Sequence, residues 1–370
     1  MRPRLSLLAV GLAALTLGST LWAAETTRTL KIEYTAAPGT KFLVENLAGT
    51  MRVVPGSTDK VVAVAEIHAE SQELADLIRF EQVVSEKGEP ALRVVYPVDR
   101  YTRYRLPASH GNGSEGGWAG FFGSLFGGSN VSTEYAGRKV KVSSGDGVMV
   151  YADVQVQIPA KGLSARLRNV AGPLWGEGLD GKLEFDTASG NITLSRMTGE
   201  IAADSGSGDV KASDLTGSFS CDVGSGNCDL TGFDGDSVSC DTGSGNVKIR
   251  SAHAHRLTLD TGSGNVKAAD VDIEQFDADT GSGDVELAAV GARLTSIRAD
   301  TGSGSVTLRL PGNASFEALA DQGSGDIRMA FSDAEPIRHK SEIVGYRRGD
   351  GRIRITVETG SGDLRIEPGL

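Results

Sequence analysis

The chain has 370 residues, including 49 glycines but only 6% aromatic residues, and its formal net charge is −11. So much glycine with so few aromatic side chains argues against a helical protein and favours turn-rich β structure. A protein this acidic is a poor candidate for nucleic-acid binding, because phosphate recognition requires clustered lysine and arginine. We expect instead a surface that attracts cations.

The first 24 residues have the pattern of a secretory signal peptide. Arg2 and Arg4 precede an apolar run over 5–17, and small residues lead to Ala23 and Ala24. This order predicts cleavage after Ala23 or Ala24, with a retained membrane anchor as the alternative. No later segment approaches the roughly 20 apolar residues of a membrane-spanning helix. We therefore expect an exported protein, in the periplasm or at the cell surface, with no transmembrane segment after cleavage.

Residues 25–160 are expected to form a β-rich N-terminal cap. Alternating apolar and polar residues predict strands over 61–67, 92–96 and 151–158, and a short helix is expected over 72–80. Residues 45–50 resemble a turn of the repeat described below. A cap would cover the end of a stack of strands, whose unpaired edge otherwise promotes aggregation.

One segment of this cap, at about residues 100–135, departs from the strand pattern. Arg103 and Arg105 lie in its basic and aromatic first part, and a glycine-rich stretch follows with four large aromatic residues, Trp118, Phe121, Phe122 and Phe126. These aromatic residues either cover the end of the stack or are exposed for contact with a partner. In the second case they and the two arginines are the predicted binding site.

A repeated Ser-Gly-Asn/Asp motif dominates residues 161–370. Its glycine recurs at intervals of 18 to 21 residues up to Gly325 and once more 37 residues later, at Gly190, Gly208, Gly226, Gly245, Gly264, Gly283, Gly304, Gly325 and Gly362. Such a period is typical of a solenoid, in which each turn of the chain, called a rung here, buries its apolar face by stacking on its neighbours. We expect residues 331–354 to form an insertion or a rung without the motif.

Within each rung, apolar residues alternate with polar ones, as in Leu257-Thr258-Leu259-Asp260. This predicts at least two short strands per rung, joined by a Gly-Ser-Gly turn. Glycine suits the turn because it readily adopts positive φ, and the neighbouring Asp or Asn can accept main-chain hydrogen bonds. The predicted fold is all-β: a parallel β-helix, or β-solenoid, of about ten rungs of 18–21 residues with right-handed connections.

The motif Asp-Thr-Gly-Ser-Gly-Asn-Val is complete at 241–247 and 260–266, and a strand over 154–159 precedes the repeats. In these features the chain resembles the bacterial adhesin-like β-strand-repeat family, a domain of unknown function related to autotransporter adhesin head domains. The resemblance covers most of the chain after the signal peptide. It implies a secreted or envelope-associated β-solenoid and supplies no active-site residues.

Asp-Thr-Gly-Ser also surrounds the catalytic carboxylates of aspartic proteases, where two aspartates face one another. Here the motif recurs one rung apart, beginning at 241, 260, 279 and 300, so we expect the aspartates to stack side by side and favour a turn role. Stacking would place like charges about 5 Å apart. Hydrogen bonds from turn N–H groups are the favoured compensation, and calcium at Asp241, Asp260 and Asp279 is the alternative.

Cys221, Cys228 and Cys240 fall at inward positions, where cysteine most often serves as a small apolar core residue. A disulfide between Cys221 and Cys240, one rung apart, is the alternative, since exported proteins meet oxidising conditions. A metal site is not expected at these cysteines. His253 and His255 are expected in a solvated turn.

The sequence contains no nucleophile elbow, Walker loop or zinc-protease helix motif, and no cofactor is expected. The predicted function is that of an exported, non-enzymatic, adhesin-like or envelope-associated protein that binds an envelope polysaccharide or a surface protein. The alternative is a polysaccharide lyase or hydrolase, which needs two or three carboxylates in a groove. The insertion would supply candidate groups for it: Glu335, His339, Lys340 and Glu342.

Overall fold

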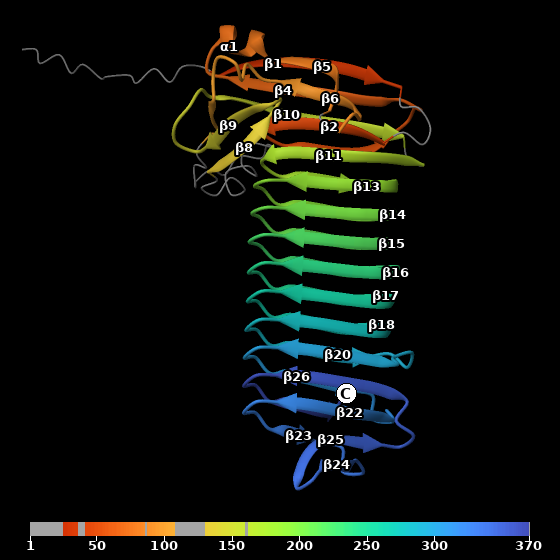
Figure 1. Cartoon of the computed structure of the whole chain (residues 1–370). Helices are drawn as coiled ribbons and strands as arrows, with labels where there is room; N and C mark the ends of the chain where they lie inside the picture. The colour runs from red at the N-terminus through yellow and green to blue at the C-terminus, as the bar shows by residue number, and fades with distance from the viewer. Residues whose placement is uncertain (1–24, 36–40, 86, 108–129, 160–161, 370) are drawn as a thin grey trace, which may run out of the picture.

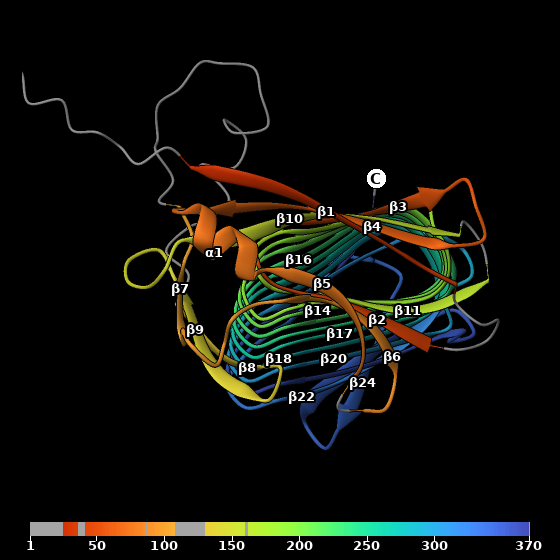
Figure 2. The same cartoon turned by 90° about the horizontal axis from the view of Figure 1, so that it is seen from above.

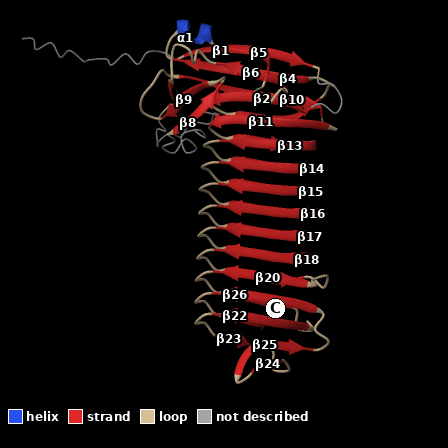
Figure 3. Cartoon of the chain, viewed as in Figure 1, coloured by secondary structure: helices blue, strands red, loops and turns tan. Residues whose placement is uncertain are grey.

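The computed structural model describes residues 25–35, 41–85, 87–107, 130–159 and 162–369. Its strands form a tall column with an N-terminal cap at one end and a hairpin at the other (Figure 1). One short helix, at the cap end, interrupts the β structure (Figure 3). No helix in these ranges is long and apolar enough to cross a membrane. The all-β, solenoid-like architecture predicted from the repeat is confirmed.

Five long strands stack in parallel and in register in the middle of the column. Each runs from one Ser-Gly turn of the motif to the next: β14 (Ile192–Ser205), β15 (Val210–Val223), β16 (Cys228–Thr242), β17 (Val247–Thr261) and β18 (Val266–Thr280). In β17, Leu257 and Leu259 are buried, whereas Thr258 and Asp260 are exposed. Figure 2 shows the stacked rungs from above, and the inward side chains of successive rungs make one continuous core.

Each of these strands bends at a position that the sequence pattern does not mark. The bend divides a rung into a first leg, after the turn, and a second leg, before the next turn. The residue at the bend has a left-handed backbone in these five strands, with φ of 51–56° at Arg196, Asp214, Ser251 and Asp270 and 76° at Gly232, and also at the equivalent positions of the adjoining rungs, Gly178 (69°) and Ala289 (51°). Glycine and aspartate, which tolerate this conformation, occupy four of these seven positions, whereas at Arg196, Ser251 and Ala289 stacking of the rungs imposes it against local propensity.

The solenoid begins within the predicted cap. β2 (Lys41–Ala48) and β3 (Met51–Gly56) stack in parallel on β11 (Leu163–Ala171) and β12 (Leu174–Glu177), so residues 45–50 do contain a rung turn. β13 (Asp180–Thr187) then joins β11 to β14.

Further strands cover the edge of this first rung. β6 (Pro90–Val95) and β5 (Arg79–Val84) extend the sheet beyond β2, while β10 (Val150–Pro159), β4 (Val61–Ala69) and β1 (Thr26–Tyr34) extend it beyond β3. The predicted helix is present as α1 (Gln72–Leu77), and Ser71 accepts a hydrogen bond from the amide of Leu74. A separate sheet contains β7 (Arg103–Arg105), β8 (Val131–Tyr135) and β9 (Arg138–Ser143).

A buried polar network joins the cap to the solenoid. Glu45 is 2% exposed and accepts hydrogen bonds from Arg93 Nε at 2.6 Å and from an Arg168 guanidinium nitrogen at 2.8 Å. The side chain of the adjacent residue, Asn46, donates a hydrogen bond of 2.9 Å to Oδ1 of Asn169 on the stacked strand β11. Such groups are stable inside a protein only when they are paired, so they specify how the first two rungs stack.

The last rungs are out of sequence order. After β19 (Val285–Val290), β20 (Ser296–Thr301) and β21 (Val306–Leu310), the next strands in space are β26 (Ile353–Thr359) and β27 (Leu364–Pro368). β22 (Phe316–Gln322) and β23 (Ile327–Met329) lie beyond them (Figure 1). The expected insertion at 331–354 is a hairpin of β24 (Glu335–His339) and β25 (Glu342–Arg348), which pairs antiparallel with β22 and covers the end.

Candidate functional site

The turn glycines are required because neighbouring backbones touch. A Cβ added to Gly264 would lie 1.8 Å from the carbonyl oxygen of Gly245, and one added to Gly245 would lie 1.8 Å from that of Gly226. In this column of glycines the positive φ that side chains avoid occurs at the cap end, at Gly49, Gly172, Gly190 and Gly208, and not at Gly226, Gly245, Gly264, Gly283 or Gly304. The expectation that these glycines provide positive φ is therefore wrong for most rungs. Close stacking is the reason instead.

The threonine of the motif fastens one turn to the next. Thr261 is fully buried; its hydroxyl donates to the carbonyl oxygen of Gly245 at 2.8 Å and accepts from the amide of Gly264 at 3.0 Å. Thr242 and Thr280 make the same pair of contacts. Both partners are main-chain groups that burial would otherwise leave unpaired, so each threonine stabilises two rungs.

The last position of the motif forms a ladder along the turns. Asn227 Oδ1 accepts from the amide of Asn246 at 2.9 Å, and Asn246 Oδ1 accepts from the amide of Asn265 at the same distance. Asn265 in turn accepts from Asp284 at 2.8 Å. The predicted side-chain capping of the turn is thus made by this residue.

The aspartates of the motif form a separate column on the surface, which we call the aspartate column. The strand register stacks Asp186, Asp204, Asp222, Asp241, Asp260, Asp279 and Asp300, followed by Glu358 and then Asp321. The stacking predicted for Asp241, Asp260, Asp279 and Asp300 is present, and Glu358 continues the column between Asp300 and Asp321. Side-by-side carboxylates of this kind do not form the facing pair that an aspartic protease uses.

The aspartate column retains uncompensated like charge in its middle, whereas its first member, Asp186, is ion-paired with Arg166. Within the described residues, no hydrogen bond to the carboxylates of Asp241, Asp260 or Asp279 is present, so the expected compensation by turn N–H groups is wrong for them. Partial burial, followed by the charges of Asp241 and Asp279, raises the pKa of Asp260. The pKa of Asp279 is raised by burial and by Asp300. No three of these carboxylates converge on one point within the described part of the chain, and calcium at Asp241, Asp260 and Asp279 stays a prediction.

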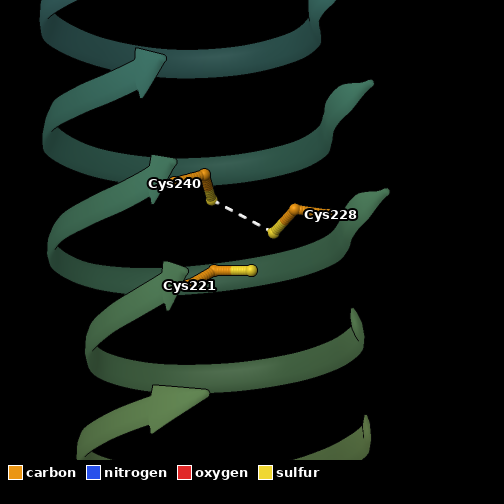
Figure 4. Close-up of side chains that lie close together, drawn as sticks. All are labelled: Cys221, Cys228 and Cys240. Carbon is orange, nitrogen blue, oxygen red and sulfur yellow. Dashed lines mark hydrogen bonds between the residues drawn. The ribbon is translucent and has the colours of Figure 1, made fainter. Parts of the chain in front are cut away.

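Three cysteines converge inside the column (Figure 4). Cys221 and Cys240 are register neighbours on the second legs of β15 and β16, and Cys228 reaches toward them from the first leg of β16. Their sulfur atoms all lie within 4.8 Å of one another, and Cys228 Sγ is 3.3 Å from Cys240 Sγ. All three are free thiols in the structure. The disulfide between Cys221 and Cys240 stays a prediction. The sulfur–sulfur hydrogen bond of the cluster joins Cys228 to Cys240 instead.

Hydrogen bonding within this cysteine cluster shifts the pKa values of its thiols. The S–H groups of Cys221 and Cys228 lower the pKa of Cys240. Hydrogen bonds with Cys221 and Cys240, together with burial, raise the pKa of the Cys228 thiol well above its usual value. Because the three thiols share these hydrogen bonds, they titrate as one coupled group.

The predicted aromatic binding residues Trp118, Phe121, Phe122 and Phe126 lie outside the described residues. The two arginines are on β7 and both are ion-paired. Arg103 contacts Asp146, and Arg105 lies 3.2 Å from a carboxylate oxygen of Glu70. The Arg103 side chain remains 65% exposed, so its charge is accessible to a partner.

A family profile described as Toastrack DUF4097 matches residues 152–367. The chain belongs to the Toastrack DUF4097 family. This confirms the predicted relationship to a domain of unknown function built from β-strand repeats. No curated protein sequence shows a significant match to the chain.

Solved structures similar to this Toastrack chain come from several bacteria. A candidate lipid-binding protein of Parabacteroides distasonis is 12% identical over 92% of this chain and 96% of its own, with a TM-score of 0.41. A candidate adhesin of Bacteroides fragilis is 12% identical over 92% of this chain and 97% of its own, with a TM-score of 0.36. A candidate cell adhesion protein of Clostridium sporogenes is 11% identical over 93% of this chain and 99% of its own, with a TM-score of 0.21.

Two histidines of the Toastrack domain lie on strand β17 rather than in the expected turn. His253 Nδ1 is 2.9 Å from Asp234 and His255 Nδ1 is 3.0 Å from Glu274, so each pairs with an acid on a neighbouring rung. Arg293 also binds Glu274. The pattern indicates an exposed ion-pair network between rungs.

The groups considered for a glycan-active enzyme, Glu335, His339, Lys340 and Glu342, all occupy exposed positions of the β24–β25 hairpin.

Proposed function

We propose that this Toastrack chain is an exported, non-enzymatic binding or structural protein of the cell envelope, in the periplasm or at the cell surface. The observation that carries the proposal is the repeated parallel stacking of the solenoid rungs from β13 to β20, which a single register shift at Gly217/Ser218 interrupts without displacing the aspartates from one another. Equivalent outward positions recur about every 4.8 Å along the column. One kind of contact can therefore be repeated many times with an extended partner.

The aspartate column is the most uniform part of that surface. From β13 onward its carboxylates lie at one position of each rung, and three of them have a raised pKa because of burial and their neighbours. Such a strip attracts positively charged groups. The partner that fits is an envelope polysaccharide or a surface protein that carries spaced cationic groups, with Arg103, Arg105 and the aromatic segment as a second contact.

The proposal is tested by mixing the purified chain with envelope polysaccharide or with envelope surface protein and measuring the sedimented chain. The triple variant Asp241→Asn, Asp260→Asn, Asp279→Asn should bind less. The matched control Asp214→Asn, Asp236→Asn, Asp270→Asn removes the same charge from another exposed part of the rungs and should bind as the parent does. A third variant without residues 108–129 tests the aromatic segment.

The same assay distinguishes an enzyme. New reducing or unsaturated ends released from polysaccharide by the parent chain would overturn the proposal in favour of a lyase or hydrolase. Equal binding by all variants would show that neither surface makes the contact.

We also infer that the solenoid is right-handed, with about ten rungs of 18–21 residues, because parallel strand connections are overwhelmingly right-handed. An experimental electron-density map would decide the hand.

A further inference from the structure

The three buried cysteines are arranged as a ligand set. Cys221, Cys228 and Cys240 are 3%, 0% and 1% exposed, and their side chains point at one another from two rungs and both legs (Figure 4). They are the only three His, Cys, Asp or Glu residues of the described chain whose ligand atoms all lie within 4.8 Å of one another. A sulfur-lined site of this kind lies apart from every surface considered for partner binding.

The surroundings of the cluster are apolar. In the strand register, Ala203 and Leu259 flank the stacked pair Cys221 and Cys240. Val210 and Val247 flank Cys228 in the same way. All four neighbours are buried hydrophobic residues. The cluster therefore offers three sulfur ligands and no fourth donor.

The geometry points to a three-coordinate thiolate site for a soft monovalent metal ion, Cu(I). Metal–sulfur bonds of about 2.3 Å place the three sulfur atoms of a trigonal site about 4 Å apart, which small side-chain movements reach from the present arrangement. Zinc favours four ligands, whereas Cu(I) is an ion that soft sulfur ligands select. One Cu(I) and three thiols give one bound ion, three thiolates and three released protons.

Burial also determines when the ion binds. With all three sulfur atoms enclosed, the ion enters before the rungs of β15 and β16 close, and it leaves only when they open. Binding is then coupled to folding, so the bound ion should stabilise the folded chain and exchange slowly.

The test uses the full chain, reduced and refolded without oxygen in the presence of one equivalent of Cu(I), then separated from free ion with a Cu(I) chelator. We expect one copper per chain, a sulfur-to-copper charge-transfer band, and three sulfur neighbours at one distance by X-ray absorption. The unfolding temperature should rise relative to the chain refolded without the ion.

In two variants a cysteine is replaced by the residue that an adjacent rung has at the equivalent position, so both variants should fold. Cys228→Val continues the column of Val210 and Val247, and Cys221→Ala repeats Ala203. Each should weaken Cu(I) binding at least about 100-fold, since even residues outside the ligand set cost 10–100-fold. The control Val247→Ala removes buried volume of the same column without removing sulfur and should retain one copper.

Failure of the parent chain to retain copper would overturn the proposal, as would equal retention by Cys228→Val and Cys221→Ala. Isolation of the exported chain with Cys228 joined to Cys240, detected as the loss of two hydrogen atoms from its mass, would also overturn it, because that bond consumes two ligands.

Discussion

At the scale of single residues, each position of the Asp-Thr-Gly-Ser-Gly-Asn motif has its own structural role. The glycine at the end of Gly-Ser-Gly makes room for the neighbouring backbone, the threonine pairs two main-chain groups, and the asparagine binds the next turn. The aspartate does none of this and faces solvent. Each position should therefore respond differently to substitution.

Gly264→Ala should destabilise the fold by about 3 kcal/mol, because a methyl group 1.8 Å from the Gly245 carbonyl oxygen forces two rungs apart. Denaturant unfolding measures the change. Ser263→Ala, at the exposed position beside it, is the control and should alter stability little. A Gly264→Ala chain as stable as its parent would show that the turns tolerate wider spacing.

Thr261→Val should cost about 2 kcal/mol, because it leaves the half-buried Gly245 carbonyl and the buried Gly264 amide without these partners at nearly unchanged side-chain volume. Thr258→Val changes the same residue type at an exposed position of β17 and is the matched control. Equal unfolding free energies for the two variants would contradict the role assigned to the threonine hydroxyl.

At the scale of the strand, in-register stacking repeats every feature of a rung, including unfavourable ones. The aspartate column follows from this rule, since a parallel register cannot avoid placing equivalent residues side by side. Because the pKa of Asp260 is raised in the folded chain, the folded chain holds this proton to higher pH than the unfolded chain does. Its contribution to stability is present at low pH and is lost as pH rises from about 3.9 through the folded pKa.

Asp260→Asn should accordingly stabilise the chain by about 0.5 kcal/mol at pH 7 and not at pH 3, the size of a like-charge contact across strands. Unfolding midpoints at the two pH values measure the difference. Asp214→Asn, in the column of Arg196 and Gly232, should show no such gain at pH 7. A gain that is the same at both pH values would point to a cause other than charge.

At the scale of the whole molecule, both ends of the solenoid are covered by antiparallel strands. At the C-terminal end, β26 and β27 insert between two rungs that precede them in sequence, and the β24–β25 hairpin covers the outermost one. β26 and β27 are therefore interior to the stack, and among the described strands the edges left open at this end include those of the short strands β23 and β24, of which β24 is charged. Short charged edges limit pairing between molecules.

A chain ending at Asp350 should lose the order of residues 311–350 and associate through the exposed edges of β20 and β21, because the strands that pair with them are missing. Limited proteolysis and size-exclusion chromatography would show both effects. A chain ending at Pro368 keeps β26 and β27 and is the control. If the shorter chain resisted proteolysis as well as the control, the inserted rung would not close the end.

Part of the candidate site could be predicted from the sequence. The stacking of Asp241, Asp260 and Asp279 and the inward position of the three cysteines follow from the period and the alternation. The approach of Cys228 to Cys240 does not, because it depends on how far apart the two legs of one rung lie. The same holds for the ion pairs of Arg103 and Arg105, whose acids lie on distant segments.

The sequence by itself determined the strands, the inward residues and the stacking partners of the central rungs, because alternation sets the buried face and a fixed period repeats the register. Tertiary structure alone decided the left-handed bend at Ser251 and its equivalents, the rung that β2 and β3 add, and the insertion of β26 beside β20. These features arise from contacts between segments far apart in the chain. Local patterns carry no record of such contacts, and strand edges accept any partner that completes their hydrogen bonds.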